Sequence, residues 1–379
     1  MSIKFESIPT PSYVFDEDTF RRNLEMIDTI KKRIGGEIII SLKGFAMWGA
    51  FHILREYGFK AAASSLNEAK LIVEQLGSNA NTYIPAYSAE EFDKVLSLSS
   101  HITFNSLTQL NKFLPRIKEN TPNVQVAIRI NPESSPLQYN IYNSCIQGSR
   151  FGVTVGHLNG TTIEGIDGLH FHTLCESSSY DLENMLELIQ NKFASLIKKI
   201  KWINVGGGHL LTSPEYDIDH LVEVITMFKE KTGLEIIMEP CTAFVWNTGY
   251  LVSRVLDIVT TDNINTAILD ISFSAHLLDF HLMNIKPSVI GATEPQKGKP
   301  TYRLGGNSCL TGDYMGEWSF DDVLKVGDVV IFNNIAHYTM VRDNMFNGVT
   351  QPSIGIWNNK EGYRLVRKFG YNDYKNRLS

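Results

Sequence analysis

A lysine at the end of an apolar run is the first candidate for chemistry in this chain. Lys43 follows Glu37–Leu42, a β-branched stretch that is typical of a buried parallel strand. Burial disfavours the charged form of a lysine, and a neutral amine is a nucleophile toward carbonyl carbon. A lysine that caps a strand is more often a solvated loop residue, so the interpretation depends on what surrounds Lys43.

Three other predicted strand ends carry groups that complement this amine. The consecutive glycines Gly206, Gly207 and Gly208 expose backbone N–H groups that suit a phosphate. Glu239 can keep a pyridine nitrogen protonated, and His172 can stack on the face of the ring. Taken alone, His172 could be a core histidine, the glycines a tight turn and Glu239 a capping carboxylate. These separate explanations do not account for the three features occurring together at strand ends. With Lys43 as the imine-forming amine, the set indicates a pyridoxal 5′-phosphate site.

These residues need a scaffold that brings strand ends together. Short apolar runs alternate with amphipathic stretches over the first 240 residues, which predicts a (β/α)8 barrel over residues 17–240. Working residues in such barrels lie at the C-terminal strand ends. The predicted strands are Glu37–Leu42, Lys60–Ser64, Thr82–Tyr87, His101–Asn105, Val124–Ile130, Ile166–His172, Trp202–Gly206 and Glu235–Glu239.

The pattern changes after Pro240 to glycine-punctuated β segments. They predict a C-terminal antiparallel β-rich domain, a β-barrel or sandwich, over residues 241–379. Residues 1–16 include the strand-like Ser12–Phe15, which we expect to join this domain. The segments are Gly249–Thr260, Thr266–Ser272, Thr301–Leu304 and Val329–Asn333.

Composition narrows the class of protein. The chain has 379 residues, 43% of them hydrophobic, with a net charge of −6 and a pI near 6.0. A negative net charge and the lack of a basic stripe argue against a nucleic-acid partner. No apolar leader or membrane span is evident, so we expect a cytoplasmic protein without a membrane partner. The cysteines, Cys145, Cys175, Cys241 and Cys309, lack metal-type spacing, so we expect neither a metal site nor a disulfide framework.

The chain resembles the fold type III, or alanine-racemase-fold, family of pyridoxal-phosphate enzymes, in the branch that holds ornithine and diaminopimelate decarboxylases. Each motif is weak alone, but their order and spacing are specific, and they cover nearly the whole chain. They are Pro11–Asp16, Lys43, Arg150–Gly152, Phe171-His172, Gly206–Gly208, Glu239-Pro240, Cys309 with Gly312-Asp313, and Tyr338 close to Phe346–Gly348.

This resemblance implies a role for each residue. Lys43 would carry the cofactor, and Gly206–Gly208 with Tyr338 would hold its phosphate. Cys309 and Asp313 resemble residues that reach into the neighbouring subunit's site, which implies a homodimer with shared active sites. The implied catalytic residues are Lys43, His172, Glu239 and Cys309, and Glu239 would pair with the pyridine nitrogen.

Departures from the diaminopimelate decarboxylases indicate a different substrate. Leu310 follows the cysteine where they have Glu, Cys241-Thr242 stands where they have Gly-Arg, and Lys286 replaces an arginine that clamps the distal carboxylate. The motifs at 42–46, 173–176, 275–279 and 309–313 look instead like the carboxynorspermidine/carboxyspermidine decarboxylases. A polyamine substrate has a cationic tail, which carboxylates would bind. The candidate substrate-binding residues are Glu176, Glu239, His276, Asp279 and Asp313.

Three alternatives remain at this point. Diaminopimelate decarboxylase, or another basic amino acid decarboxylase of the same fold, is the nearest one. An amino-acid racemase of this fold would place an arginine against the pyridine nitrogen, and Glu239 argues against that. A lone-barrel carrier of pyridoxal phosphate would not need the second domain.

Overall fold

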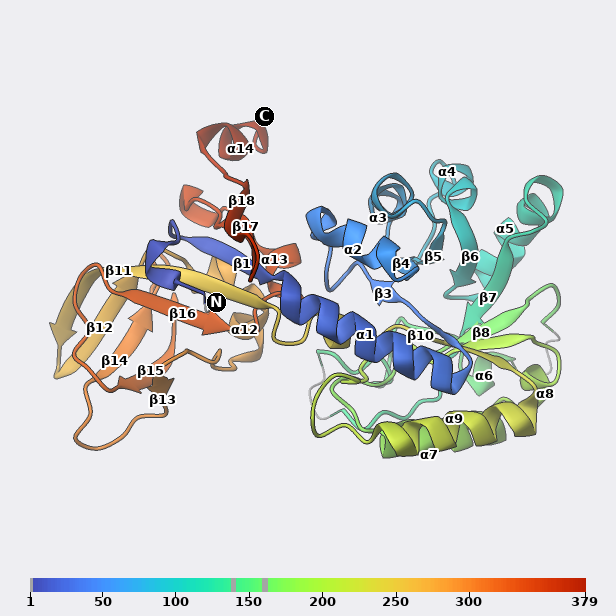
Figure 1. Ribbon diagram of the computed structural model, residues 1–379. Coiled ribbons are helices and arrows are strands. Elements are labelled where there is room, and N and C mark those ends of the chain that lie inside the picture. The colour runs from blue at the N-terminus through green and yellow to red at the C-terminus, as the bar shows by residue number, and fades with distance from the viewer. Residues whose placement is uncertain (1–2, 138–140, 159–162) are drawn as a thin grey trace. The chain divides into compact units, whose positions relative to one another are not determined.

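The computed structural model describes residues 3–137, 141–158 and 163–379, in two compact units (Figure 1). One unit comprises Asn23–Phe244, and the other comprises Met1–Arg22 with Val245–Ser379. The prediction of a TIM-like barrel with a β-rich second domain is confirmed. The boundaries at 17–240 and 241–379 stay a prediction.

The first unit is built on a parallel barrel. The order of its strands is β2-β10-β9-β8-β7-β6-β5-β4-β3. The predicted first strand is divided at Ile39, whose N–H donates to Met238 O at 2.9 Å, whereas Ile40 N–H donates to Lys60 O at 3.1 Å. This change of partner closes the barrel. The strands are β2 (Glu37–Ile38), β3 (Ile40–Ser41), β4 (Ala61–Ala63), β5 (Ala80–Tyr83), β6 (Ser99–Phe104), β7 (Gln125–Arg129), β8 (Gly168–His170), β9 (Trp202–Asn204) and β10 (Glu235–Met238).

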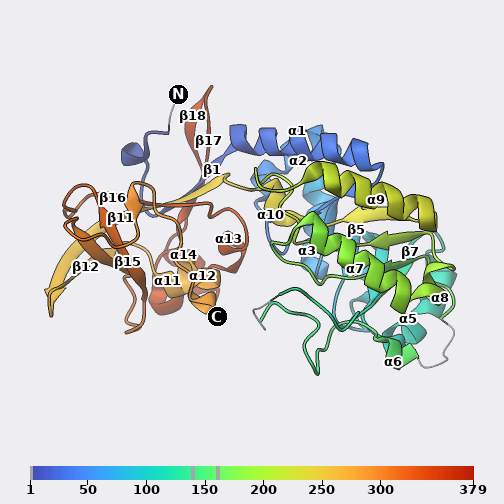
Figure 2. The same ribbon diagram turned by 90° about the horizontal axis from the view of Figure 1, so that it is seen from below.

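Helices connect the barrel strands, and α3, α5, α7 and α9 begin at side-chain caps. The Ser178 hydroxyl accepts from Asp181 N–H and the Asp181 carboxylate accepts from Ser178 N–H, which makes a capping box. The helices α7 and α9 lie side by side outside the strands (Figure 2). The helical segments are α1 (Glu17–Ile34), α2 (Phe51–Glu56), α3 (Leu66–Leu71), α4 (Phe92–Ser97), α5 (Leu107–Asn120), α6 (Val155–Leu158), α7 (Ser179–Lys192), α8 (Ala194–Ile197), α9 (Ile218–Thr232) and α10 (Cys241–Phe244).

Side chains fill the barrel, so it is a packed core and not a pore. One buried cluster combines four strand residues with the residue between β2 and β3: Ala62, Ala127, Trp202 and Ile237, with Ile39. A Cβ built at Gly168 would lie 2.3 Å from the Trp202 ring, so the indole occupies the space that a side chain on β8 would need. This packing leaves the C-terminal strand ends as the place for a site.

The second unit contains a mixed sheet in the order β13-β15-β14-β12-β11-β1-β17-β18, with β16 on β11. Most pairs are antiparallel, as expected, but β1 with β17 and β12 with β14 run in parallel. Parallel pairs need long connections, which join segments far apart in the chain. The strands are β1 (Ser12–Asp16), β11 (Gly249–Thr261), β12 (Ile264–Leu269), β13 (Ala292–Thr293), β14 (Thr301–Gly305), β15 (Tyr314–Phe320), β16 (Val329–Asn333), β17 (Ser353–Asn358) and β18 (Gly362–Arg367).

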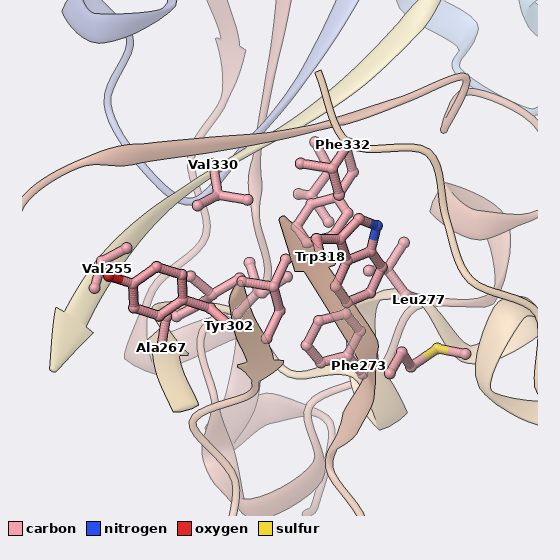
Figure 3. Packing of buried hydrophobic residues seen from close by; sticks show 14 of the residues in the cluster. Val255, Ala267, Phe273, Leu277, Tyr302, Trp318, Val330 and Phe332 are labelled. Atoms are coloured by element: carbon pink, nitrogen blue, oxygen red, sulfur yellow. The ribbon is translucent and has the colours of Figure 1, made fainter. Parts of the chain in front are cut away.

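A hydrophobic cluster anchors this sheet (Figure 3). Trp318 packs within it together with Phe273, Leu277 and Phe332, and the rings of Phe273 and Phe332 meet edge to face at 5.7 Å between centroids. Among the described residues no helix has the length and apolarity needed to cross a bilayer. Short helices complete the unit: α11 (Phe273–His276), α12 (Leu278–Met283), α13 (Thr339–Arg342) and α14 (Tyr371–Asn376).

Candidate active site

Lys43 lies just beyond β3, with its amine against a histidine. Its Nζ is 3.1 Å from His172 Nε2. Burial lowers the pKa of Lys43, nearby Glu239 opposes that shift, and Arg129 adds to it. The structure therefore places at the strand end a lysine that loses its proton more readily than one in water, as nucleophilic chemistry requires.

The His172 ring is oriented from both sides. Its Nδ1 accepts a hydrogen bond from Gly207 N–H at 3.4 Å, which assigns the proton of the neutral ring to Nε2, the atom that faces Lys43. Burial lowers the pKa of His172 well below its usual range, and the nearby Lys43 lowers it further. A neutral imidazole is thus held against a lysine amine.

Glu239 lies at the end of β10 and is fixed by a chain of hydrogen bonds. Its Oε1 accepts from Asn204 Nδ2 at 2.7 Å, and Asn204 Oδ1 accepts from Gly206 N–H at 2.9 Å. Burial raises the pKa of Glu239, whereas nearby Lys43 lowers it. The carboxylate, the glycine loop and the lysine therefore belong to one electrostatic unit, in which Asn204 is the link that the sequence did not reveal.

The glycine loop lies against the chain that follows β8. Gly206 and Gly208 have φ angles of 73° and 94°, which side chains rarely adopt. A Cβ at Gly206 would lie 2.6 Å from Phe171 O, and one at Gly208 would lie 2.4 Å from the Leu174 carbonyl. Only glycine fits this close approach, which leaves a bare backbone loop of the kind that cradles a phosphate.

Two further groups of the barrel were not given a role from the sequence. The Arg129 guanidinium lies 4.8 Å from the Tyr83 ring and 4.6 Å from the Phe151 ring, and it donates to His172 O at 3.3 Å. His170 is buried, and neither of its ring nitrogens has a hydrogen-bond partner in the described part of the chain. Both residues lie at strand ends, on β7 and β8, and that position was the available signal.

His170, His172 and Glu239 also place possible metal-ligand atoms within 4.8 Å of one another. The Arg129 guanidinium acts electrostatically on His170 and brings positive charge to the place a cation would occupy. The donor set instead fits pyridoxal phosphate: a deprotonatable amine for its carbonyl, a flat imidazole for its ring, a buried carboxylate for its nitrogen and the side-chain-free loop Gly206–Gly208 for its phosphate.

Three predicted site residues lie in the other unit, where His276 and Asp279 are buried and Tyr338 is half-buried. Both Asp279 carboxylate oxygens accept from the Thr339 hydroxyl, each at 3.1 Å, and burial raises the Asp279 pKa. His276 Nδ1 accepts from Ser272 N–H at 3.2 Å, and burial lowers the pKa of His276 to about 4. Tyr338 precedes α13 with a φ of 58°, a strained backbone for a bulky residue.

The remaining candidates differ in exposure. Cys309 is exposed, and its N–H donates to Asn347 Oδ1 at 2.9 Å. Asp313 is buried, and its carboxylate accepts hydrogen bonds from its own unit. Glu176, in the barrel unit, is exposed with a φ of 47°. The structure thus brings Lys43, His172, the glycine loop and Glu239 together, and it places Cys309 and Asp313 on one loop of the other unit.

Comparison with known proteins supports the same chemistry. The family described as pyridoxal-dependent decarboxylase, C-terminal sheet domain, matches residues 12–336. Carboxyaminopropylagmatine decarboxylase of Synechocystis sp. is 42% identical, covering 99% of this chain and 97% of that protein. Carboxynorspermidine/carboxyspermidine decarboxylase of Campylobacter jejuni is 36% identical, covering 98% of both.

A solved structure extends this similarity to the fold. Carboxynorspermidine decarboxylase from Campylobacter jejuni, complexed with norspermidine, has a TM-score of 0.89 and 35% identity, covering 98% of this chain and all of that one. Diaminopimelate decarboxylases are distant relatives: that of Vibrio cholerae is 23% identical, covering 91% of this chain and 86% of that protein.

Proposed function

We propose, because this chain belongs to the family of pyridoxal-dependent decarboxylases, that it removes CO2 from carboxynorspermidine or carboxyspermidine to give norspermidine or spermidine. The cofactor of the family is pyridoxal phosphate. The contact between Lys43 and His172, beside the buried Glu239, carries the assignment of the reaction to the barrel. The substrate class is supported by full-length relatives that act on carboxylated polyamines.

Bound pyridoxal phosphate supplies an electron sink for the carbon that loses CO2. Glu239 would hold a proton at the pyridine nitrogen, and Asn204 keeps that carboxylate in place. Lys43 would bind the cofactor, His172 would stack on its ring, and Gly206–Gly208 would bind its phosphate. A further phosphate contact from Tyr338 is what the family resemblance implies. Cys309 or Lys43 would return a proton to the α-carbon.

The proposed enzyme is a cytoplasmic homodimer. Cys309 of one protomer completes the site that contains Lys43 of its partner, as the family resemblance implies. Among the candidates for the cationic tail, Glu176 is the carboxylate exposed to solvent in the barrel unit. Asp279 is bonded to Thr339 within its own unit, which supports a structural role for it.

Carboxyaminopropylagmatine is a second candidate substrate. The observation that favours it is the 42% identity to the Synechocystis enzyme of that name. Its tail ends in a planar guanidinium, which prefers a carboxylate that accepts two parallel hydrogen bonds, whereas an ammonium is a compact point charge. The two tails therefore require different geometries from the same carboxylates.

A competition assay tests the proposal. Purified holoenzyme receives carboxyspermidine, carboxynorspermidine, carboxyaminopropylagmatine and meso-diaminopimelate, and CO2 and amine products are measured, with Lys43→Ala as the blank. We expect the carboxylated triamines to give the highest kcat/KM and to differ from each other by about 10- to 200-fold at most, since one methylene is worth about 1–3 kcal/mol. Highest kcat/KM for the guanidino substrate would establish the second candidate. Preference for diaminopimelate, or no CO2 from any substrate, would contradict both.

A further inference from the structure

Two segments of the β-rich unit are tied to the short helix α11, which spans Phe273–His276. Asp313, at the end of loop 306–313, accepts a hydrogen bond from Ser274 N–H at 2.9 Å. Asn344, before the turn 346–348, donates its own N–H to Ala275 O at 3.0 Å. Helix α11 is therefore a common anchor for both segments, and Cys309 lies in the first of them.

The Asp313 side chain fixes the loop that contains Cys309. Its Oδ2 accepts from the Ser308 hydroxyl at 2.6 Å and from Ser308 N–H at 3.2 Å. Gly306 N–H donates to Asp313 O at 2.6 Å, which closes the neck of the loop. A Cβ at Gly306 would lie 2.3 Å from Asp313 Oδ2, so the neck closes only around glycine. Asp313 is 4% exposed, so its side chain is buried.

Asn347 holds the same loop from the other segment. Its Oδ1 accepts a hydrogen bond from Cys309 N–H at 2.9 Å. The residue has a φ of 55°, a left-handed conformation that asparagine tolerates better than most residues. Phe346 N–H donates to Asn344 Oδ1 at 2.9 Å, which links this turn back to α11. The backbone of Cys309 is therefore fixed on an otherwise exposed loop.

We propose that Asp313 and Asn347 are positioning residues that hold the Cys309 thiol in place, and that Asp313 does not bind substrate. This rests on the proposed function, in which Cys309 works on the α-carbon. Asp313 already accepts three hydrogen bonds from its own unit, and an ammonium group would have to displace them. A buried carboxylate that lost these donors would be left unsatisfied, which is costly.

Substitution of each anchor tests the proposal by kinetics. Asp313→Asn turns one of the accepting oxygens into a donor, and Asn347→Gly removes the acceptor while it permits the positive φ. We expect each to lower kcat about 10- to 100-fold, the usual cost of a small misplacement. KM should stay within about twofold, because no substrate contact is lost. The matched control, Asn347→Asp, retains the acceptor oxygen and should keep kcat within about threefold.

A double substitution separates positioning from binding. If Asp313 acts through Cys309, Cys309→Ala combined with Asp313→Asn should lose no more kcat than Cys309→Ala alone, within about twofold. Losses that multiply, or a KM for the carboxylated triamine that rises about tenfold in Asp313→Asn with kcat unchanged, would overturn the proposal.

A labelling experiment does not depend on turnover. Iodoacetamide modification of the folded holoenzyme is followed for the Cys309 and Cys175 peptides by mass spectrometry, with the thermal unfolding midpoint as a check of folding. Asp313→Asn and Asn347→Gly should change the Cys309 rate more than about threefold and leave the Cys175 rate unchanged. Unchanged Cys309 labelling in both variants overturns the positioning role. If the wild type releases no CO2 and the two variants still show the changed Cys309 labelling rate, the proposed function alone is refuted.

Discussion

The two units hold their functional candidates in different ways. In the barrel, Lys43, His172 and Glu239 lie at strand ends, where burial shifts their pKa values and neighbouring strands fix their side chains. In the β-rich unit, Cys309 is exposed on a loop, and hydrogen bonds to other segments fix its backbone. Burial therefore sets the pKa values of the barrel residues, whereas hydrogen bonds to other segments set the position of Cys309.

This contrast suggests two kinds of sensitivity to mutation. The barrel groups act on one another electrostatically, so the loss of one changes the protonation of the others. The Cys309 loop depends on polar contacts that can be removed one at a time. Substitutions or pH changes that alter one unit and leave the other unchanged can therefore test whether the two units respond differently.

Lys43→Ala should have the largest effect. The barrel loses its only amine in contact with His172 among the described residues, so CO2 release should fall more than about 10³-fold. Borohydride reduction and peptide mass spectrometry should place the cofactor on Lys43 in the wild type. The exposed Lys60→Ala serves as control and should retain activity. A trapped cofactor on another lysine would end the assignment.

Glu239→Gln should separate cofactor binding from turnover. An amide cannot hold the proton at the pyridine nitrogen, so kcat should fall about 10²- to 10³-fold while the cofactor absorbance remains. The measurement is kcat with the cofactor content determined on the same sample. Unchanged turnover would mean that Glu239 has only a structural role at the end of β10.

Acid should destabilise both units through buried histidines. His209 in the barrel and His276 in the β-rich unit each have a pKa of about 4, because burial disfavours the charged ring. The unfolded chain binds protons at a pKa near 6.5, so stability is full above that value and is lost as the pH falls toward 4. At pH 4.5 each histidine should lower the free energy of unfolding by about 2–3 kcal/mol.

Urea unfolding at pH 7.5 and pH 4.5 measures this loss. His209→Gln and His276→Gln should each reduce the difference in unfolding free energy between the two pH values, even where they lower stability at pH 7.5. A pH dependence that neither variant changes would show that other groups control acid unfolding.

Thr339→Val should have the smallest effect. The substitution keeps the volume and removes the hydroxyl that donates to both oxygens of buried Asp279, which should cost about 1–3 kcal/mol of unfolding free energy. The KM for the carboxylated triamine should stay unchanged if Asp279 is structural. A raised KM at unchanged stability would return Asp279 to the substrate-binding residues.

Strand ends explain how much of the barrel site could be predicted. Lys43, Gly206–Gly208 and Glu239 follow apolar runs, and parallel strands bring such ends together. The first strand was expected to be continuous, but it changes partner at Ile39 to close the barrel, and a sequence pattern does not specify a pairing partner. The link through Asn204 likewise depends on which strand lies beside β10.

The β-rich unit was harder to predict. Gly316, with a φ of 67°, interrupts the alternation of Tyr314–Phe320, and this strand, β15, was missed. β17 and β18 were missed as well. The inward orientation of Asp313 depends on Ser274, which lies 39 positions earlier in the chain. No local period encodes such a contact, so Asp313 was interpreted from its residue type as a ligand for ammonium.

Subunit complementation tests the central claim, that the barrel of one protomer and the Cys309 loop of its partner make one decarboxylase site. Lys43→Ala and Cys309→Ala proteins are each assayed, then mixed under conditions of verified subunit exchange. Random mixing makes about half of the dimers hetero, each with one intact site of two, so about a quarter of wild-type CO2 release should return. A mixture that stays as inactive as its components would contradict the shared site.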